Sequence, residues 1–147
     1  MKKIFLSAAF LLTVAAGTSF ATEDPVTGDE AKETFAKEFA GAESAVWKQS
    51  GDYFKVNFIF RGYRTEAYFN KEGGLEGSVR SLLYDQLPLT IVTSVNKRFA
   101  DADVLDVYEI NNTEGTVYRI TLKSDSKKIR VKLDPAGNML EKEKLKN

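Results

Sequence analysis

The acidic residues of the chain are the first candidates for chemistry. Asp101, Asp103 and Asp106 lie close together in the segment DADVLD, and clustered carboxylates are typical of calcium-binding loops. The segment lacks the glycine and the terminal glutamate of an EF-hand loop, so we interpret it as a loop that follows a helix. Glu66 is a second candidate, because a carboxylate pair could hydrolyse cell-envelope material. Such a pair needs a cleft and a raised pKa, which an open sheet would not provide.

The composition restricts the possible chemistry further. The 147 residues include no histidine and no cysteine. Histidine is the commonest general base and transition-metal ligand, so Ser-His-Asp, Cys-His, zinc and haem-type sites are excluded. Glycine-rich nucleotide-binding motifs are absent as well. We therefore expect no enzymatic activity, no cofactor and no metal, and stability that comes from packing without disulfides.

The N-terminus has the pattern of an export signal. Lys2 and Lys3 precede an apolar run, and Ser19 and Ala21 are the small residues that signal peptidase requires. We predict that residues 1–21 are removed after Ala21, and that the mature protein is periplasmic or secreted, with no membrane span. Without these residues and their two lysines, 126 residues remain, with 19 basic and 21 acidic side chains. This slight negative balance argues against a nucleic-acid partner.

The remaining chain reads as one helix followed by strands. Ala31, Phe35 and Phe39 recur on one face of a helix predicted over residues 28–40. From residue 45 the pattern alternates, which indicates antiparallel strands. Residues 54, 56, 58 and 60 would face the helix, while residues 53, 55, 57 and 59 would face away. A fourth, short strand is predicted over residues 75–81.

The same series then occurs a second time. Ile91, Val95 and Phe99 repeat the helix spacing at an offset of 60 residues. Residues 46–48 match 107–109 at an offset of 61, and residues 53–58 and 70–75 match 117–122 and 134–139 at an offset of 64. We predict two repeats, residues 22–84 and 85–147, fused into one α+β domain. Its single antiparallel sheet of about eight strands would carry two helices on one face and leave the other uncovered.

The segment LPLTIVTSVNKRFADADVLDVYEI, residues 87–110, resembles the exported PepSY-like family of Bacteroidetes, which is also called β-lactamase-inhibitor-like. The resemblance covers nearly the whole mature chain, once for each repeat. The sequence departs from the family pattern at Ala100, where proline is frequent, and its first repeat lacks the Leu-Pro start. The resemblance implies a curved antiparallel sheet with two helices on one side, a concave side available to a partner, and no catalysis.

The uncovered sheet face is predicted to carry the partner site. Aromatic residues interleaved with arginine are typical of protein-binding hot spots, although such residues also suit any exposed pleated surface. We expect a protein-binding surface centred on Trp47, Arg64 and Tyr68, while Trp47 could instead cap the core. The complete predicted site is Trp47, Tyr53, Lys55, Arg64, Tyr68, Tyr108, Arg119, Lys128 and Arg130.

The second hairpin is strongly basic, with six lysines and arginines against Asp125 between residues 115 and 133. It could bind an acidic protein, a phosphate-bearing glycolipid or a polysaccharide. We favour a solvated face that lysine protects from aggregation, with Glu141 and Glu143 as cross-strand partners.

These observations together predict an exported, non-enzymatic binding module that contacts a protein of the cell envelope through the uncovered sheet face, either as an interaction module or as an inhibitor. The alternatives are a small cell-envelope hydrolase, or a protein that holds a lipid or small ligand between the helices and the sheet.

Overall fold

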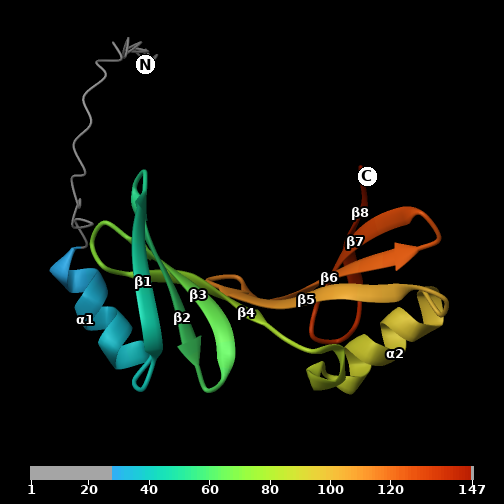
Figure 1. The fold of residues 1–147 in the computed structure, drawn as a ribbon, viewed down its shortest axis with the longest axis horizontal. Coiled ribbons are helices and arrows are strands. Elements are labelled where there is room, and N and C mark those ends of the chain that lie inside the picture. The colour runs from blue at the N-terminus through green and yellow to red at the C-terminus, as the bar shows by residue number, and fades with distance from the viewer. Residues whose placement is uncertain (1–27, 147) are drawn as a thin grey trace, which may run out of the picture.

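A computed structural model describes residues 28–146, so the predicted export signal lies outside the described residues. The described chain consists of two repeats, each a helix followed by four strands, which lie side by side in Figure 1. The first comprises α1 (Asp29–Glu38), β1 (Glu43–Ser50), β2 (Tyr53–Phe60), β3 (Tyr63–Asn70) and β4 (Leu75–Ser81). A 3-10 helix, η1 (Tyr84–Gln86), leads to the second, which comprises α2 (Leu89–Arg98), β5 (Asp103–Asn112), β6 (Gly115–Ser124), β7 (Lys127–Leu133) and β8 (Met139–Leu145).

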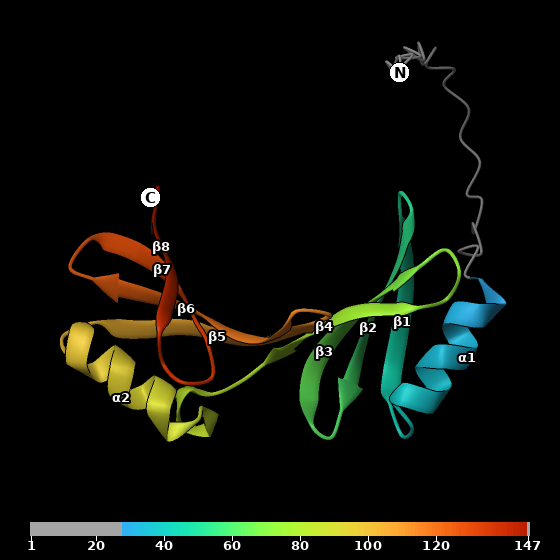
Figure 2. The same cartoon turned by 180° about the vertical axis from the view of Figure 1, so that it is seen from behind.

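The eight strands form one sheet in chain order from β1 to β8, and every neighbouring pair is antiparallel. The sheet is curved, and both helices lie on its convex side (Figures 1 and 2). The concave side carries no helix in the part of the chain that the structure describes. The predicted fold class, including the fourth strand over residues 75–81, is confirmed. No helix within residues 28–146 is long and apolar enough to cross a membrane.

The two repeats share their irregularities as well as their elements. Each helix ends one residue before a phenylalanine, Phe39 or Phe99, whose N–H caps the last turn. The first strand of each repeat is bulged, between Glu43 and Val46 and between Val104 and Asp106. A second register shift occurs on both fourth strands, where Glu76 and Leu140, which are 64 residues apart, have no partner on the third strand. Bulges set the local twist of a strand, so both repeats curve alike.

The structure corrects the predicted alignment of the first strands of the two repeats and the predicted loop at residues 101–106. Val107 is buried and pairs with Ile120, just as Trp47 pairs with Val56. The offset at this strand is therefore 60 rather than 61, and Trp47 corresponds to Val107. In the DADVLD segment only residues 101 and 102 lie between elements, because β5 already begins at Asp103.

A glycine turn joins the sheet to the helix in each repeat. Gly73 (φ +79°) and Gly137 (φ +86°) adopt the left-handed conformation and lie against the first turns of α1 and α2. A Cβ on Gly73 would lie 2.5 Å from the Glu30 Cβ, and one on Gly137 would lie 2.6 Å from the Thr90 carbonyl oxygen. Both turns are closed in the same way, since Asn70 Oδ1 accepts from the N–H of residue 74 and Asp134 Oδ1 from that of residue 138.

Each repeat has its own hydrophobic core between its helix and the convex face of its strands. The first contains Ala31, Phe54, Val56, Phe58, Ala67 and Phe69. The second contains Leu82, Leu87, Ile91, Val95, Val107, Tyr118, Ile120, Leu122, Val131 and Leu133. Burial of such side chains contributes roughly 25 cal/mol per Å² of apolar surface, and the chain has no disulfide to add to it.

The repeats meet where β4 pairs with β5, and a polar network supports this junction on the convex side. Arg80 Nη2 lies 2.9 Å from Glu109 Oε1, and the Tyr118 hydroxyl donates to Glu109 Oε2 at 3.3 Å. The Arg80 guanidinium also stacks 4.9 Å from the centre of the Tyr63 ring. Because the Glu109 side chain is only 15% exposed, this ion pair is better shielded from water than a surface pair.

Candidate functional site

The concave face displays eight of the nine predicted site residues. Residues paired across antiparallel strands share a face, so the register assigns their sides. Lys55 pairs with Tyr68 and Tyr108 with Arg119, and all four lie opposite the core. By the same register the face also includes the remaining predicted residues, Tyr53, Arg64, Lys128 and Arg130.

Trp47 lies on the convex face. The prediction that it stands at the centre of the concave binding surface is therefore wrong, and the alternative that it caps the core is confirmed. Its ring centre is 5.3 Å from that of Phe35 and 5.7 Å from that of Phe69, within the first core. The hairpin between β1 and β2 has a two-residue loop and pairs Ser50 with Tyr53. Odd-numbered residues of β1 therefore share a face with even-numbered residues of β2, which places Trp47 beside the buried Val56.

A hydrogen-bonded cluster occupies the first half of the concave face. Glu66 Oε2 lies 2.9 Å from Lys55 Nζ and accepts a hydrogen bond from the Tyr68 hydroxyl at 2.8 Å. Lys55 Nζ also lies 5.6 Å from the centre of the Tyr68 ring. Three side chains from β2 and β3 are thus held in one arrangement.

The pKa of Glu66 shows what this cluster can do. Burial alone would raise it, but the hydrogen bonds from Lys55 and Tyr68 and the charges of Lys55 and Arg119 outweigh that effect and lower the pKa. Glu66 therefore stays ionised at neutral pH. A general acid requires the opposite shift, so the environment of Glu66 does not prepare it for that role.

Basic side chains occupy the second half of the face. The Arg119 guanidinium stacks 4.8 Å from the centre of the Tyr108 ring. Lys132 Nζ lies 2.9 Å from Glu141 Oε2, and Arg130 Nη1 lies 3.5 Å from Glu143 Oε2. The predicted cross-strand partners Glu141 and Glu143 are therefore confirmed.

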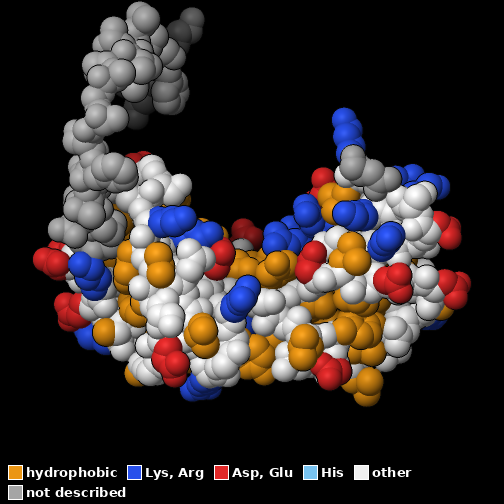
Figure 3. Space-filling view, viewed as in Figure 1, with side chains coloured by type: hydrophobic (Ala, Val, Ile, Leu, Met, Phe, Trp, Pro, Cys, Tyr) orange, Lys and Arg blue, Asp and Glu red, His pale blue; other side chains and the backbone are white. Residues whose placement is uncertain are grey.

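The two halves join across an apolar centre. Val79 on β4 pairs with Ile110 on β5, and both lie on the concave face, half-buried. Figure 3 shows the hollow between the two raised ends of the sheet, with Lys and Arg side chains along it and apolar side chains on its floor. Sequence reasoning missed Val79 and Ile110 as site residues, because the pairing of β4 with β5 joins different repeats.

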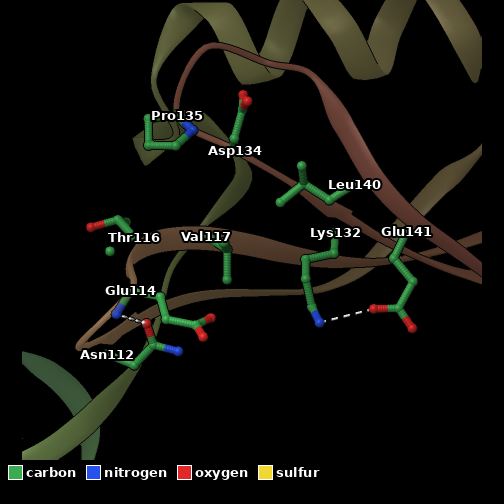
Figure 4. Close-up of a pocket in the computed structure, with 10 residues that line it drawn as sticks. Asn112, Glu114, Thr116, Val117, Lys132, Asp134, Pro135, Leu140 and Glu141 are labelled. Atoms are coloured by element: carbon green, nitrogen blue, oxygen red, sulfur yellow. Dashed lines mark hydrogen bonds and ion pairs between the residues drawn. The ribbon is translucent and has the colours of Figure 1, made fainter.

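Two depressions lie in the second half. The smaller, of about 210 Å³, is lined by Ile110, Arg119, Arg130, Val131, Lys132, Glu141 and Glu143. The larger is an open groove of about 720 Å³ between the β5–β6 hairpin and the β7–β8 turn (Figure 4). Its charged lining residues are Glu114, Lys132, Asp134 and Glu141. Within residues 28–146 no group of three or more acidic, histidine or cysteine side chains could hold a metal ion.

Comparisons with known proteins identify the fold. No family model matches the chain, and no curated protein matches it. Among solved structures it is similar to a BLIP-like protein from Bacteroides fragilis, with a TM-score of 0.75 and 19% identity over 82% of this chain and 87% of that chain.

Two further solved structures from Bacteroides have the same fold. A DUF2874 family protein from Bacteroides ovatus has a TM-score of 0.73 and 22% identity over 82% of this chain and 87% of that chain. A protein from Bacteroides eggerthii, described as one of the "putative periplasmic proteins", has a TM-score of 0.73 and 18% identity over 80% and 88%. The chain thus has the BLIP-like fold, and the resemblance to β-lactamase-inhibitor-like proteins is confirmed at the level of the fold.

Proposed function

We propose that the protein is an exported, non-enzymatic module that binds a protein of the cell envelope on the concave face of its sheet. One observation carries the proposal: two helices cover the convex face, while the uncovered concave face carries tyrosine, arginine and lysine side chains. A sheet face that no helix covers and that carries aromatic and arginine residues has the composition of protein interfaces.

The alternative functions have less support. Glu66 is tied to Lys55 and Tyr68 and its pKa is lowered, which disfavours a hydrolase that uses it as an acid. A ligand between helix and sheet would have to displace aromatic rings, because Phe35 and Phe39 pack 4.9 Å and 4.8 Å from Phe58, measured between ring centres. Turnover of a glycan or peptide substrate that Glu66→Gln abolishes would restore the hydrolase.

Two separate observations support the export of this protein. Residues 1–21 have the pattern of a cleaved signal, and the Bacteroides eggerthii protein of the same fold is one of the "putative periplasmic proteins". We propose that the mature chain begins at Thr22 and acts in the periplasm or outside the cell. Mass spectrometry of the protein purified from its native envelope would test the cleavage site.

Photocrosslinking in the envelope of the producing cell tests the binding face. The mature chain is compared with a Tyr53→Ala/Arg64→Ala variant, because both side chains are exposed and form no hydrogen bond or ion pair with the described residues. A Lys32→Ala/Lys97→Ala variant is the matched control, since these residues are exposed on the two helices of the convex side. We expect the wild type and the control to crosslink one identified protein, and the Tyr53→Ala/Arg64→Ala variant to fail to crosslink it. Equal recovery by all three would contradict it.

A further inference from the structure

The smaller hollow of the concave face concentrates cationic donors around an apolar floor. Arg119 from β6 and Arg130 and Lys132 from β7 line a volume of about 210 Å³, together with Ile110 from β5. Guanidinium groups pair with carboxylates through two parallel hydrogen bonds. Two of them beside one ammonium group are therefore suited to an anionic ligand.

The donors of this hollow are only partly used within the chain. Arg119 stacks on Tyr108 and its charge acts on Glu66, but no ion pair or hydrogen bond joins it to a described residue. Arg130 has one contact with Glu143, at the long distance of 3.5 Å, and its Nε is buried without a partner among residues 28–146. A guanidinium has five N–H donors, so both arginines can donate hydrogen bonds to a further carboxylate.

The residues that now contact these donors indicate the chemistry of the ligand. Glu141 and Glu143 place carboxylates on Lys132 and Arg130, and their side chains are 59% and 54% exposed on the edge strand β8. Exposed ion pairs of this kind contribute little to stability, so an incoming carboxylate can replace them. The same two glutamates would repel a polyanion such as a phosphate-rich glycolipid more strongly than a single carboxylate, because repulsion grows with the charge of the ligand.

We propose that this hollow binds an Asp or Glu side chain from an acidic segment of a partner protein, with an adjacent apolar residue packed on Ile110. The inference rests on the proposed function and deepens it, because the hollow belongs to the same concave face. Charge complementarity selects the partner. The arginine side chains of the hollow have N–H donors that no described residue uses, so they favour an anionic ligand. The apolar floor and the two glutamates of the hollow favour a ligand with one or two carboxylates over a polyanion.

A random dodecapeptide library displayed on phage tests the inference with the mature chain from Thr22 as bait. Three variants are selected in parallel: Arg119→Gln/Arg130→Gln in the hollow, Tyr53→Ala/Arg64→Ala in the first half of the concave face, and Lys32→Gln/Lys97→Gln on the convex side. Circular dichroism of each variant establishes that it is folded. We expect the wild type and the convex variant to enrich peptides that carry Asp or Glu beside an apolar residue, and the hollow variant to lose them.

Calorimetry on the best enriched peptide makes the test quantitative. Replacing its acidic residue with the matching amide should weaken binding to the wild type roughly tenfold, as expected for one charge-assisted pair. In the Arg119→Gln/Arg130→Gln variant, replacing the acidic residue of the peptide with its amide should not weaken binding further. The peptide change and the protein change each remove the same carboxylate–arginine interaction.

The outcomes separate this inference from the proposed function. Peptides without acidic residues that are lost from the Tyr53→Ala/Arg64→Ala variant would overturn the carboxylate site and leave the concave face as the binding surface. Enrichment of no peptide, or equal enrichment by the hollow variant, would also overturn the site, while the crosslinking experiment tests the face independently. A concentration-dependent dimer in sedimentation that Arg119→Gln/Arg130→Gln dissociates would identify a second copy as the occupant and overturn the inference.

Discussion

Substitution of Gly73 by alanine should destabilise the first repeat, because this glycine combines a left-handed backbone with a close approach to a helix. Its φ is +79°, and an added Cβ would lie 2.5 Å from the Glu30 Cβ, 2.6 Å from the Glu30 carbonyl carbon and 2.8 Å from the Ala31 nitrogen. Two of these three contacts are with helix backbone, which cannot rotate away as the end of a flexible side chain can.

The expected magnitude has two parts. Alanine in the left-handed region costs about 1–2 kcal/mol, and forcing an extra carbon into a packed contact costs about 1–3 kcal/mol more. Gly62 is the matched control, since its φ is +84° and a Cβ there would meet nothing within 4 Å. Gly62→Ala should therefore lose only the first part, about 1–2 kcal/mol, while Gly73→Ala should lose about 2–5 kcal/mol.

Urea unfolding of the mature chain measures both values. Trp47 is the only tryptophan and packs on Phe35 and Phe69, so its fluorescence reports the core that α1 covers. Circular dichroism follows the whole sheet in parallel. If Gly73→Ala lost no more free energy of unfolding than Gly62→Ala, the contact between the glycine turn and the first turn of α1 would not constrain the fold, and the reasoning would be refuted.

Three further predictions follow from contacts in the same structure. Trp47→Ala should lower the free energy of unfolding by about 2–4 kcal/mol, measured by circular dichroism in urea; an unchanged value would place Trp47 outside the core. Glu109→Ala should destabilise by about 2–4 kcal/mol because it leaves Arg80 without its shielded partner, whereas Glu141→Ala, which breaks an exposed pair, should change stability by about 0–1 kcal/mol; equal losses would contradict this ranking. The pKa of Glu66 lies below its ordinary value of 4.5 in the folded chain, so its contribution to stability is complete above that value and is lost as the pH falls through the lowered folded pKa. Carbon-detected NMR titration should show this low pKa, and Lys55→Met should raise it; an unchanged pKa in that variant would show that Lys55 does not hold the carboxylate ionised.

The helices and strands could be predicted because their signals are local. The spacing of Phe35 and Phe39 and its recurrence at Val95 and Phe99 locate both helices, and alternation along residues 53–60 separates the two faces of β2. The duplication supports this assignment independently, because the same order of helix and strand patterns occurs in both repeats at a nearly constant offset. The single sheet then follows, because neither half has enough apolar surface to be stable alone.

The face of Trp47 and the centre of the site could not be derived in this way. Which residues of β1 share a face with those of β2 depends on the length of the hairpin loop, and a change of one residue moves every side chain to the other face. The pairing of Val79 with Ile110 depends on the contact between β4 and β5, which lie in different repeats. Both are properties of strand register, which composition does not encode locally.

The sequence by itself therefore determined the duplication, the absence of histidine and cysteine chemistry, and one sheet with two helices on one face, because periodicity and composition are properties of the chain. Only the tertiary structure decided that Trp47 belongs to the core, that Lys55, Glu66 and Tyr68 form one cluster, and that Arg119 and Arg130 line the same hollow. Those relations arise from register and from the curvature of the sheet, which bring together side chains on different strands.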